Sequence, residues 1–188
     1  MIENVSKIAP RKFLSKSGKT ITIRPAETSD AALILEMGKA ILHEHVYSLS
    51  TPDELNLSPE QEAKWIDNMT THPSHLLLVG EVDGEIIGLL DFNGGMRKRI
   101  SHSGYFGMAV SKEYRGEGLG SALLESLIWW AEQHSQIEKV SLKVHADNDR
   151  AIQLYQKHGF REEGRLKKGL KYSETSYVDI VEMARFVK

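Results

Sequence analysis

The chain has 188 residues, of which 40% are hydrophobic and 27% charged, which predicts one globular domain with its own core. Its formal net charge of -2 gives no electrostatic reason to expect nucleic acid as the main partner. Cysteine is absent, which excludes disulfides, thiolate metal sites and a covalent acyl-cysteine intermediate. The N-terminal residues lack an apolar signal core and no apolar run approaches membrane length, so we expect a cytoplasmic protein.

The N-terminal region predicts an arm followed by a single domain. Residues 1–19 are polar and basic, and only the stretch around Phe13 favours a short strand. Residues 20–188 show no repeat, low-complexity tract or second domain, so we assign them to one folded unit. Thr20–Arg24 alternates between polar and apolar side chains, which predicts a strand that Pro25 ends.

Two helices are predicted next. Thr28–Asp30 can cap the first, whose apolar residues lie within 31–37. Ser58, with a proline directly after it, is typical of the start of a second helix, which runs toward Met69. Between these helices, residues 43–57 favour turns and irregular structure.

The second half of the chain alternates strands and helices. Two apolar strands, 76–82 and 85–92, flank Asp83-Gly84, which is a strong β-hairpin signal. The later elements are predicted as a strand, a helix, a strand, a helix and two closing antiparallel strands, at residues 103–110, 119–134, 140–144, 148–158, 160–170 and 175–186. This order predicts an α/β (α+β) protein with one mixed sheet and helices on both of its faces.

A glycine-rich loop precedes the predicted helix 119–134, with glycines at positions 116, 118 and 120. A helix start presents N–H groups without intrahelical partners and carries the positive end of the helix dipole. Glycines leave those groups open to a bulky anion such as a pyrophosphate. The loop matches neither the Walker sequence nor the dinucleotide fingerprint, because it lacks the lysine of the first and the glycine spacing of the second.

Within this loop, Arg115-x-x-Gly118-x-Gly120 resembles the acyl-CoA signature of the GNAT family of N-acetyltransferases. The alternative is an ordinary glycine-rich turn between a strand and a helix. This motif alone does not decide between the two.

A second motif lies in the last predicted helix and the turn after it. Asn148, Ala151 and Tyr155 share one helix face, and a rise of 1.5 Å per residue places the first and last about 10 Å apart, a reach suited to an extended pantetheine arm. In the GNAT family this element is Asn-x-x-Ala-x-x-x-Tyr-x-x-x-Gly-Phe, which Gly159 and Phe160 complete here. Two motifs in order, at the family's usual separation, make the resemblance strong.

The resemblance covers roughly residues 20–187 and implies the GNAT fold, in which the fourth and fifth strands splay apart around the pantetheine of acetyl-CoA. Acetyl-CoA is the implied co-substrate, and no metal is expected. The cofactor-binding residues that the resemblance implies are Met108, Ala109, Val110, Arg115, Gly116, Glu117, Gly118, Leu119, Gly120, Ser121 and Asn148. For Arg115 the alternative is a solvated turn position. Asn148 can also serve as a helix cap.

Tyr155 is the implied catalytic acid. Attack of an amine on the thioester releases a thiolate, which a phenol within reach of the sulfur can protonate. Core packing is the alternative role for this ring. The general base is left open, because some family members hold a carboxylate where this chain has Gly104 and Tyr105. His102, Asp91 or a water molecule are the candidates.

The resemblance implies an N-acetyltransferase that moves an acetyl group from acetyl-CoA to a primary amine of a small molecule, amino acid or peptide by direct attack. A non-catalytic acyl-CoA-binding regulatory module is the alternative. The first two helices, their connection and the closing hairpin would form the acceptor pocket, with no nucleic acid or membrane as partner and a homodimer left open. Acidic residues there either attract a cationic amine or form an ordinary solvated surface: Glu44, Asp53, Glu54, Glu60 and Glu62.

Overall fold

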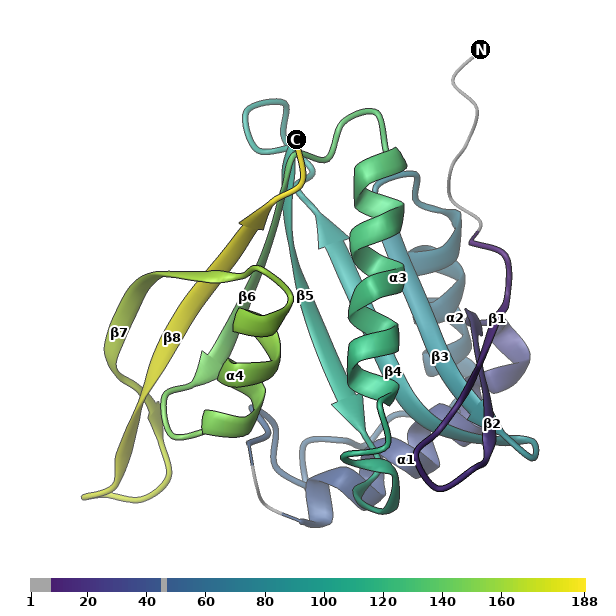
Figure 1. Cartoon of the computed structure of the whole chain (residues 1–188). Coiled ribbons are helices and arrows are strands. Elements are labelled where there is room, and N and C mark those ends of the chain that lie inside the picture. The colour runs from purple at the N-terminus through teal and green to yellow at the C-terminus, as the bar shows by residue number, and fades with distance from the viewer. Residues whose placement is uncertain (1–7, 45–46) are drawn as a thin grey trace.

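The computed structural model of the chain describes residues 8–44 and 47–188, and Figure 1 shows a sheet with helices packed on both of its faces. The strands are β1 (Arg11–Leu14), β2 (Thr20–Pro25), β3 (His75–Val82), β4 (Glu85–Gly94), β5 (Ser103–Val110), β6 (Lys139–His145), β7 (Arg161–Lys171) and β8 (Tyr177–Phe186). The helices are α1 (Ala31–His43), α2 (Pro59–Thr71), α3 (Leu119–Gln133) and α4 (Asp149–Lys157), with short 3-10 turns η1 (Thr28–Asp30) and η2 (Lys112–Tyr114). All the strands and helices predicted from the sequence are found.

The strands of the described residues form a single sheet in the order β1-β2-β3-β4-β5-β6-β8-β7. Neighbouring strands run antiparallel except β5 and β6, which are parallel. Helices α3 and α4 lie on one face, and α1 and α2 lie on the other (Figure 1). We call these the α3/α4 face and the α1/α2 face. The predicted mixed sheet with helices on both of its faces is therefore confirmed, and most of its neighbouring strands are antiparallel.

Strands β5 and β6 separate soon after they begin. Their pairing is limited to Ser103–Tyr105 of β5 with Lys139–Ser141 of β6. Beyond this point β5 continues to Val110 paired only with β4, and β6 continues to His145 paired only with β8. The splayed central strands are confirmed, and Figure 1 shows the two strands diverging. The edge of β5 from Phe106 onward thus keeps backbone groups that no strand uses.

Buried side chains form two clusters, one under each layer of helices. The larger cluster lies on the α3/α4 face, where Leu123 and Trp130 have no exposed surface and the Trp130 ring contacts Phe92 of β4 edge-on at 5.5 Å. The smaller cluster lies on the α1/α2 face and includes Ile34 of α1 and Ile66 of α2. Because strand side chains alternate between faces, these clusters assign each site residue on a strand to one side of the sheet.

Part of the predicted N-terminal arm belongs to the sheet. Strand β1 pairs with β2, with Phe13 opposite Ile21, and Ile8 is buried in the larger cluster. The short strand near Phe13 is confirmed, whereas residues 1–7 lie outside the described residues. The domain boundary at residue 20 stays a prediction.

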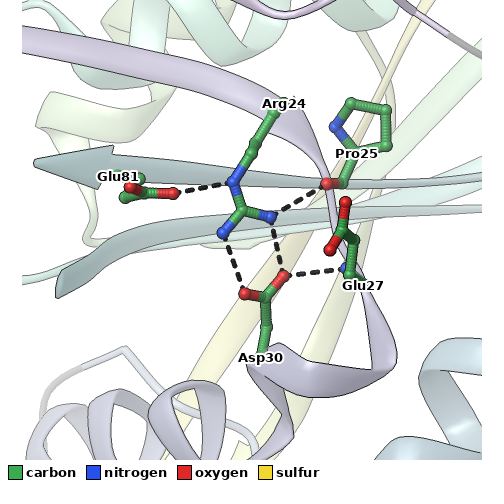
Figure 2. A network of polar contacts seen from close by, with 5 residues as sticks. All are labelled: Arg24, Pro25, Glu27, Asp30 and Glu81. Carbon is green, nitrogen blue, oxygen red and sulfur yellow. Dashed lines mark hydrogen bonds and ion pairs between the residues drawn. The ribbon is translucent and has the colours of Figure 1, made fainter. Parts of the chain in front are cut away.

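A network around Arg24 joins β2, β3 and the start of α1 (Figure 2). The Arg24 guanidinium donates two hydrogen bonds of 2.8 Å to the Asp30 carboxylate, one of 2.7 Å to Glu81 and one of 3.2 Å to the carbonyl of Pro25. Asp30 also accepts the backbone N–H of Glu27 at 2.8 Å. Burial raises the pKa of Asp30, but the bonds from Arg24 and Glu27 outweigh it and hold the pKa below its ordinary value. The network fixes the first helix against the sheet.

Candidate active site

The glycine-rich loop and the start of α3 have the geometry of an anion cradle. Gly116 and Gly118 adopt φ of 91° and 100°, a left-handed conformation that side-chain-bearing residues rarely take. The first helical hydrogen bond runs from the Ala122 N–H to the Gly118 carbonyl at 3.0 Å. The N–H groups of Leu119 and Gly120 precede this bond and have no intrahelical partner. Groups of this kind at the positive end of a helix are the ones that bind a pyrophosphate.

Gly120 has a second role in packing. A Cβ at this position would lie 3.1 Å from Cδ2 of Leu154 and 3.5 Å from Cε of Met108. The glycine therefore lets the start of α3 approach both α4 and β5. The motif combines an open cradle with close contact between three elements.

Arg115 is held by other parts of the protein. Its guanidinium makes a two-pronged ion pair with Glu44, with N···O distances of 2.7 and 2.9 Å, and its Nε donates to the carbonyl of Val110 at 2.9 Å. These bonds tie the loop to the end of α1. The predicted contact of Arg115 with a CoA phosphate stays a prediction. Glu44, considered above as an attraction for a cationic acceptor, is already paired with a cation.

Two residues near the cradle were missed by the sequence reasoning. The guanidinium of Arg150, in the first turn of α4, lies 3.4 Å from the position that a Cβ on Gly116 would occupy. His158, at the end of α4, lies with Nε2 3.0 Å from Oγ of Ser121 in the first turn of α3. Both come from the second motif region, but only the packing of α4 beside α3 brings them to the loop.

Asn148 caps α4. Its side-chain oxygen accepts the backbone N–H of Ala151 at 3.2 Å. The capping alternative is thus present in the structure, while its remaining amide group leaves a pantetheine contact as a prediction.

Tyr155 lies on the α3/α4 face beside the point where β5 leaves β6. It is 8% exposed, and its ring makes edge-on contacts with Phe106 of β5 at 5.8 Å and with Phe160 at 6.1 Å. Burial raises the pKa of Tyr155 to about 12. The phenol therefore keeps its proton throughout the neutral range and can donate it as a hydrogen bond.

Asp91 of β4 lies on the opposite, α1/α2 face, since it pairs with Leu77, a member of the smaller cluster. It also pairs with Gly107 of β5, and a Cβ on Gly107 would come within 2.8 Å of the Asp91 Oδ1. The carboxylate thus lies over β5, two residues past Tyr105, where pairing with β6 ends. Burial raises the pKa of Asp91 to about 6, against the opposing hydrogen bond from Asn93 at 2.8 Å.

His102 lies away from this group. It is exposed and precedes β5, five residues before Gly107, which corresponds to about 16 Å along a strand. Of the two side chains considered as a base, the structure places Asp91 at the opening between β5 and β6. A carboxylate with a pKa near neutrality is suited to proton transfer.

The candidate acidic residues of the acceptor region differ in their surroundings. Glu62 of α2 is buried on the side that packs against the sheet, and burial raises its pKa. Asp53, Glu54 and Glu60 are exposed, in keeping with a solvated surface. Their predicted part in acceptor binding stays a prediction.

Known proteins resemble this chain in sequence and in fold. Residues 43–160 match the model of the acetyltransferase (GNAT) family. The L-amino acid N-acetyltransferase AaaT of Escherichia coli K12 is 32% identical over 166 residues, which are 88% of this chain and 97% of that protein. A GNAT-family acetyltransferase from Streptococcus pneumoniae, 28% identical, superposes with a TM-score of 0.85 over 89% of this chain and 99% of its own. The acetyl-CoA complex of yncA from Salmonella typhimurium, at 20% identity, has a TM-score of 0.78 over 89% of this chain and 94% of its own, and shares the fold.

The chain belongs to the GNAT acetyltransferase family, and it is an acetyl-CoA-dependent N-acetyltransferase. The alternative of a non-catalytic binding module is not favoured by relatives that are N-acetyltransferases. Across the described residues, no helix is both long and apolar enough to cross a membrane. The same residues contain no group of three or more His, Cys, Asp or Glu side chains that could hold a metal ion.

Proposed function

We propose that the enzyme acetylates the α-amine of an amino acid or of a peptide N-terminus, with Asp91 as the general base and Tyr155 as the donor to the leaving sulfur. The observation that carries the proposal is their placement on opposite faces of the sheet at the opening between β5 and β6. A thioester in this opening is reached by an amine from the α1/α2 face. Its sulfur leaves toward the α3/α4 face.

The reaction is a direct transfer. Asp91 accepts a proton from the ammonium group, and the neutral amine then attacks the thioester carbonyl to form the carbon–nitrogen bond. The carbon–sulfur bond breaks and its electron pair stays on sulfur. Tyr155 donates a hydrogen bond to that sulfur. The second proton released by the new amide balances the proton gained by the free thiol.

The pKa of Asp91 favours the α-amine of a peptide N-terminus over an alkyl amine. The terminal amine of a peptide has a pKa near 8 and a lysine-like amine near 10.4, so transfer of a proton to a carboxylate of pKa about 6 is uphill by about 2.7 and about 6 kcal/mol respectively. The relative AaaT is named for acetylation of L-amino acids, which also supports an amino acid as acceptor.

The proposed co-substrate site runs from the free edge of β5 to the start of α3. Strand β5 has one edge that β6 leaves unpaired, and the backbone groups within Met108–Val110 that point to this edge would bind the pantetheine amides, apart from the Val110 carbonyl, which accepts a hydrogen bond from Arg115. The open N–H groups at the start of α3 would bind the pyrophosphate, with Arg150 as the nearby cation.

Release of free CoA from acetyl-CoA, measured with amino acids, short peptides, polyamines and aminoglycosides, tests this function. We expect CoA release with α-amines, and we expect this release to depend on the proposed base and the proposed hydrogen-bond donor. Asp91→Asn should lower kcat about 100-fold or more, and Tyr155→Phe should lower kcat with little change in acetyl-CoA affinity. Asn93→Ala, which removes only a hydrogen bond to Asp91, should have a smaller effect. If the wild type acetylates none of the α-amines, the proposed acceptor class is wrong. Full activity of Asp91→Asn would exclude Asp91 as the base.

Cytoplasmic location and a homodimer stay predictions. The β7–β8 hairpin carries exposed apolar side chains, among them Leu166 and Tyr177, which support its use as a contact between copies. Measurement of the solution mass of the wild type and of Leu166→Lys would test this contact.

A further inference from the structure

His145 is a buried polar residue that the proposed reaction does not use. It is the last residue of β6, four positions beyond the last pairing with β5 at Ser141, and shares its face of the sheet with that residue. Because Ser141 pairs with Tyr105, this is the α1/α2 face, the one on which Asp91 lies. Asp91, which lies over β5, and His145 of β6 therefore flank the opening between these strands on the face from which an amine would approach.

Among the residues that the structure describes, one nitrogen of the His145 ring has a hydrogen-bond partner and the other has none. The residue is 6% exposed, and its Nδ1 lies 2.9 Å from the Tyr172 hydroxyl. Its Nε2 is buried and has no hydrogen-bond partner in the part of the chain that the structure describes. A buried polar atom without a hydrogen bond lowers the stability of the folded protein by about 1–3 kcal/mol, so the placement of this nitrogen needs an explanation.

Two tyrosines from distant segments hold the ring. Tyr172 follows β7, and Tyr47 belongs to the connection between α1 and α2. The Tyr47 ring meets His145 edge-on at 5.6 Å, and its hydroxyl donates to the carbonyl of Asp147 at 3.2 Å. Tyr47 has φ of 57°, an unfavourable conformation for a tyrosine that is typical of residues held in place at functional sites. Two of the three segments that meet here, the connection between α1 and α2 and the closing hairpin, are among those expected to surround the acceptor.

The partners of the ring set its protonation. Burial lowers the pKa of His145, with Asp147 opposing, so the ring is neutral near pH 7. A phenol O–H is a stronger donor than the N–H of a neutral imidazole, so the Tyr172 hydroxyl donates to Nδ1. The ring proton then sits on Nε2, which becomes a donor without a partner among residues 8–44 and 47–188.

We propose that the Nε2–H of His145 donates a hydrogen bond to the acceptor, at an oxygen of the carbonyl or carboxylate group attached to the amine-bearing carbon. Tyr172 positions this N–H by fixing the tautomer of the ring. That oxygen belongs to the α-carboxylate of a free amino acid or to the first carbonyl of a peptide. The inference rests on the proposed function and makes His145 the residue that distinguishes α-amino acids from plain amines.

The test compares acceptors with and without the oxygen. The probes are L-alanine, L-leucine and L-phenylalanine, the amides of the same amino acids, the tripeptide Ala-Ala-Ala, and the plain amines ethylamine, 3-methylbutylamine and 2-phenylethylamine. For each, kcat and KM are measured with the wild type, His145→Leu, His145→Gln and Tyr172→Phe. Binding of acetyl-CoA and the melting temperature are measured for every variant.

We expect His145→Leu to lower kcat/KM for the amino acids about 10- to 100-fold, mainly through KM, and for the plain amines less than about threefold. His145→Gln, which keeps an N–H donor, should recover part of the loss, and Tyr172→Phe should show a smaller loss with the same selectivity. Two groups of acceptors are then compared, the free amino acids and the amides with the peptide. The group with the larger loss of kcat/KM identifies whether a carboxylate or a carbonyl oxygen is bound.

Three results obtained with an active wild type would overturn the inference. Equal losses with amino acids and plain amines in His145→Gln and Tyr172→Phe would show that the ring only supports the fold. A loss confined to kcat, with a changed pH profile, would make His145 a base. Unchanged kinetics in all variants would leave the ring without a role, while turnover by the wild type keeps the acetyltransferase function intact. Failure of the wild type to acetylate any probe would instead contradict the proposed acceptor class and the inference with it.

Discussion

At the scale of single residues, the proposed chemistry depends on a glycine that neither motif includes. Gly107 stands opposite Asp91, and the missing side chain leaves room for the carboxylate above β5. The sequence offered Asp91 as one of three candidate bases, because a register between two strands cannot be read from alternation alone. The register of β4 with β5 is what selects it.

Gly107→Ala should therefore reduce turnover. The added Cβ would lie 2.8 Å from Oδ1 of Asp91, and the carboxylate can move aside by rotation without disturbing the backbone. A displacement of about 1 Å at a catalytic group can lower the rate about 100-fold, so we expect kcat to fall about 10- to 100-fold with acetyl-CoA affinity nearly unchanged. Steady-state kinetics and a melting curve measure both.

Gly164→Ala is the matched control for this variant, since a Cβ there meets nothing within 4 Å. It should behave as the wild type. Wild-type turnover in Gly107→Ala would show that Asp91 can keep its place, and a melting temperature lowered by many degrees would show that the change acts on the fold.

At the scale of elements, the sequence predicted every helix and strand, because caps, the hairpin turn and apolar periodicity are local signals. It did not predict what holds the elements to one another. Arg115 and Glu44 are an example. They form a two-pronged ion pair that joins the cradle to the end of α1, and no local signal in the sequence indicates it. Arg150 is another, because its approach to the loop follows from the packing of α4 and not from its position in the motif.

The Arg24 network is an element-scale contact whose stability depends on pH. Asp30→Asn removes the carboxylate and leaves the guanidinium, which is 20% exposed, without its main partner, so we expect a loss of about 3 kcal/mol in the free energy of unfolding near pH 7. Because the folded pKa of Asp30 is lowered, the wild type keeps this stabilisation above about pH 4 and loses it as the pH falls further.

Urea unfolding of the wild type and Asp30→Asn from pH 3 to pH 7 measures this difference. It should be constant above pH 5 and shrink toward pH 3. Asp83→Asn, in the β3–β4 hairpin at φ of 51°, is the control, because asparagine suits that turn and the change should stay within about 0.5 kcal/mol. A difference that grows toward low pH would contradict the assigned sign.

At the scale of the whole molecule, the proposed mechanism requires that two faces of one sheet serve one reaction. Strands β5 and β6 part after three paired positions, and the opening would give the proposed base on one face and the phenol on the other access to a shared thioester. The resemblance in the sequence implied this splay, whereas periodicity did not show it. Tyr155 followed from its motif, but its partner across the sheet emerges only from the three-dimensional arrangement.

The pKa of Tyr155 limits what it can do. At about 12 it exceeds the pKa of about 8.5 of an ordinary thiol, so in the proposed mechanism the phenol would stabilise the leaving sulfur by a hydrogen bond more readily than by complete proton transfer. Asp91, in contrast, titrates in the range where activity can be measured. The base is therefore the more direct target.

The pH dependence of kcat/KM for an α-amino acid, in the wild type and in Asp91→Asn, tests the central claim most directly. The pKa of Asp91 is raised to about 6, so the carboxylate becomes able to accept a proton as the pH rises through that value. In the wild type, kcat/KM should rise with pH through a midpoint near pH 6, and Asp91→Asn should lose that rise together with most of its activity. A rise with the same midpoint in Asp91→Asn would contradict the claim, because the ionisation would then belong to another group.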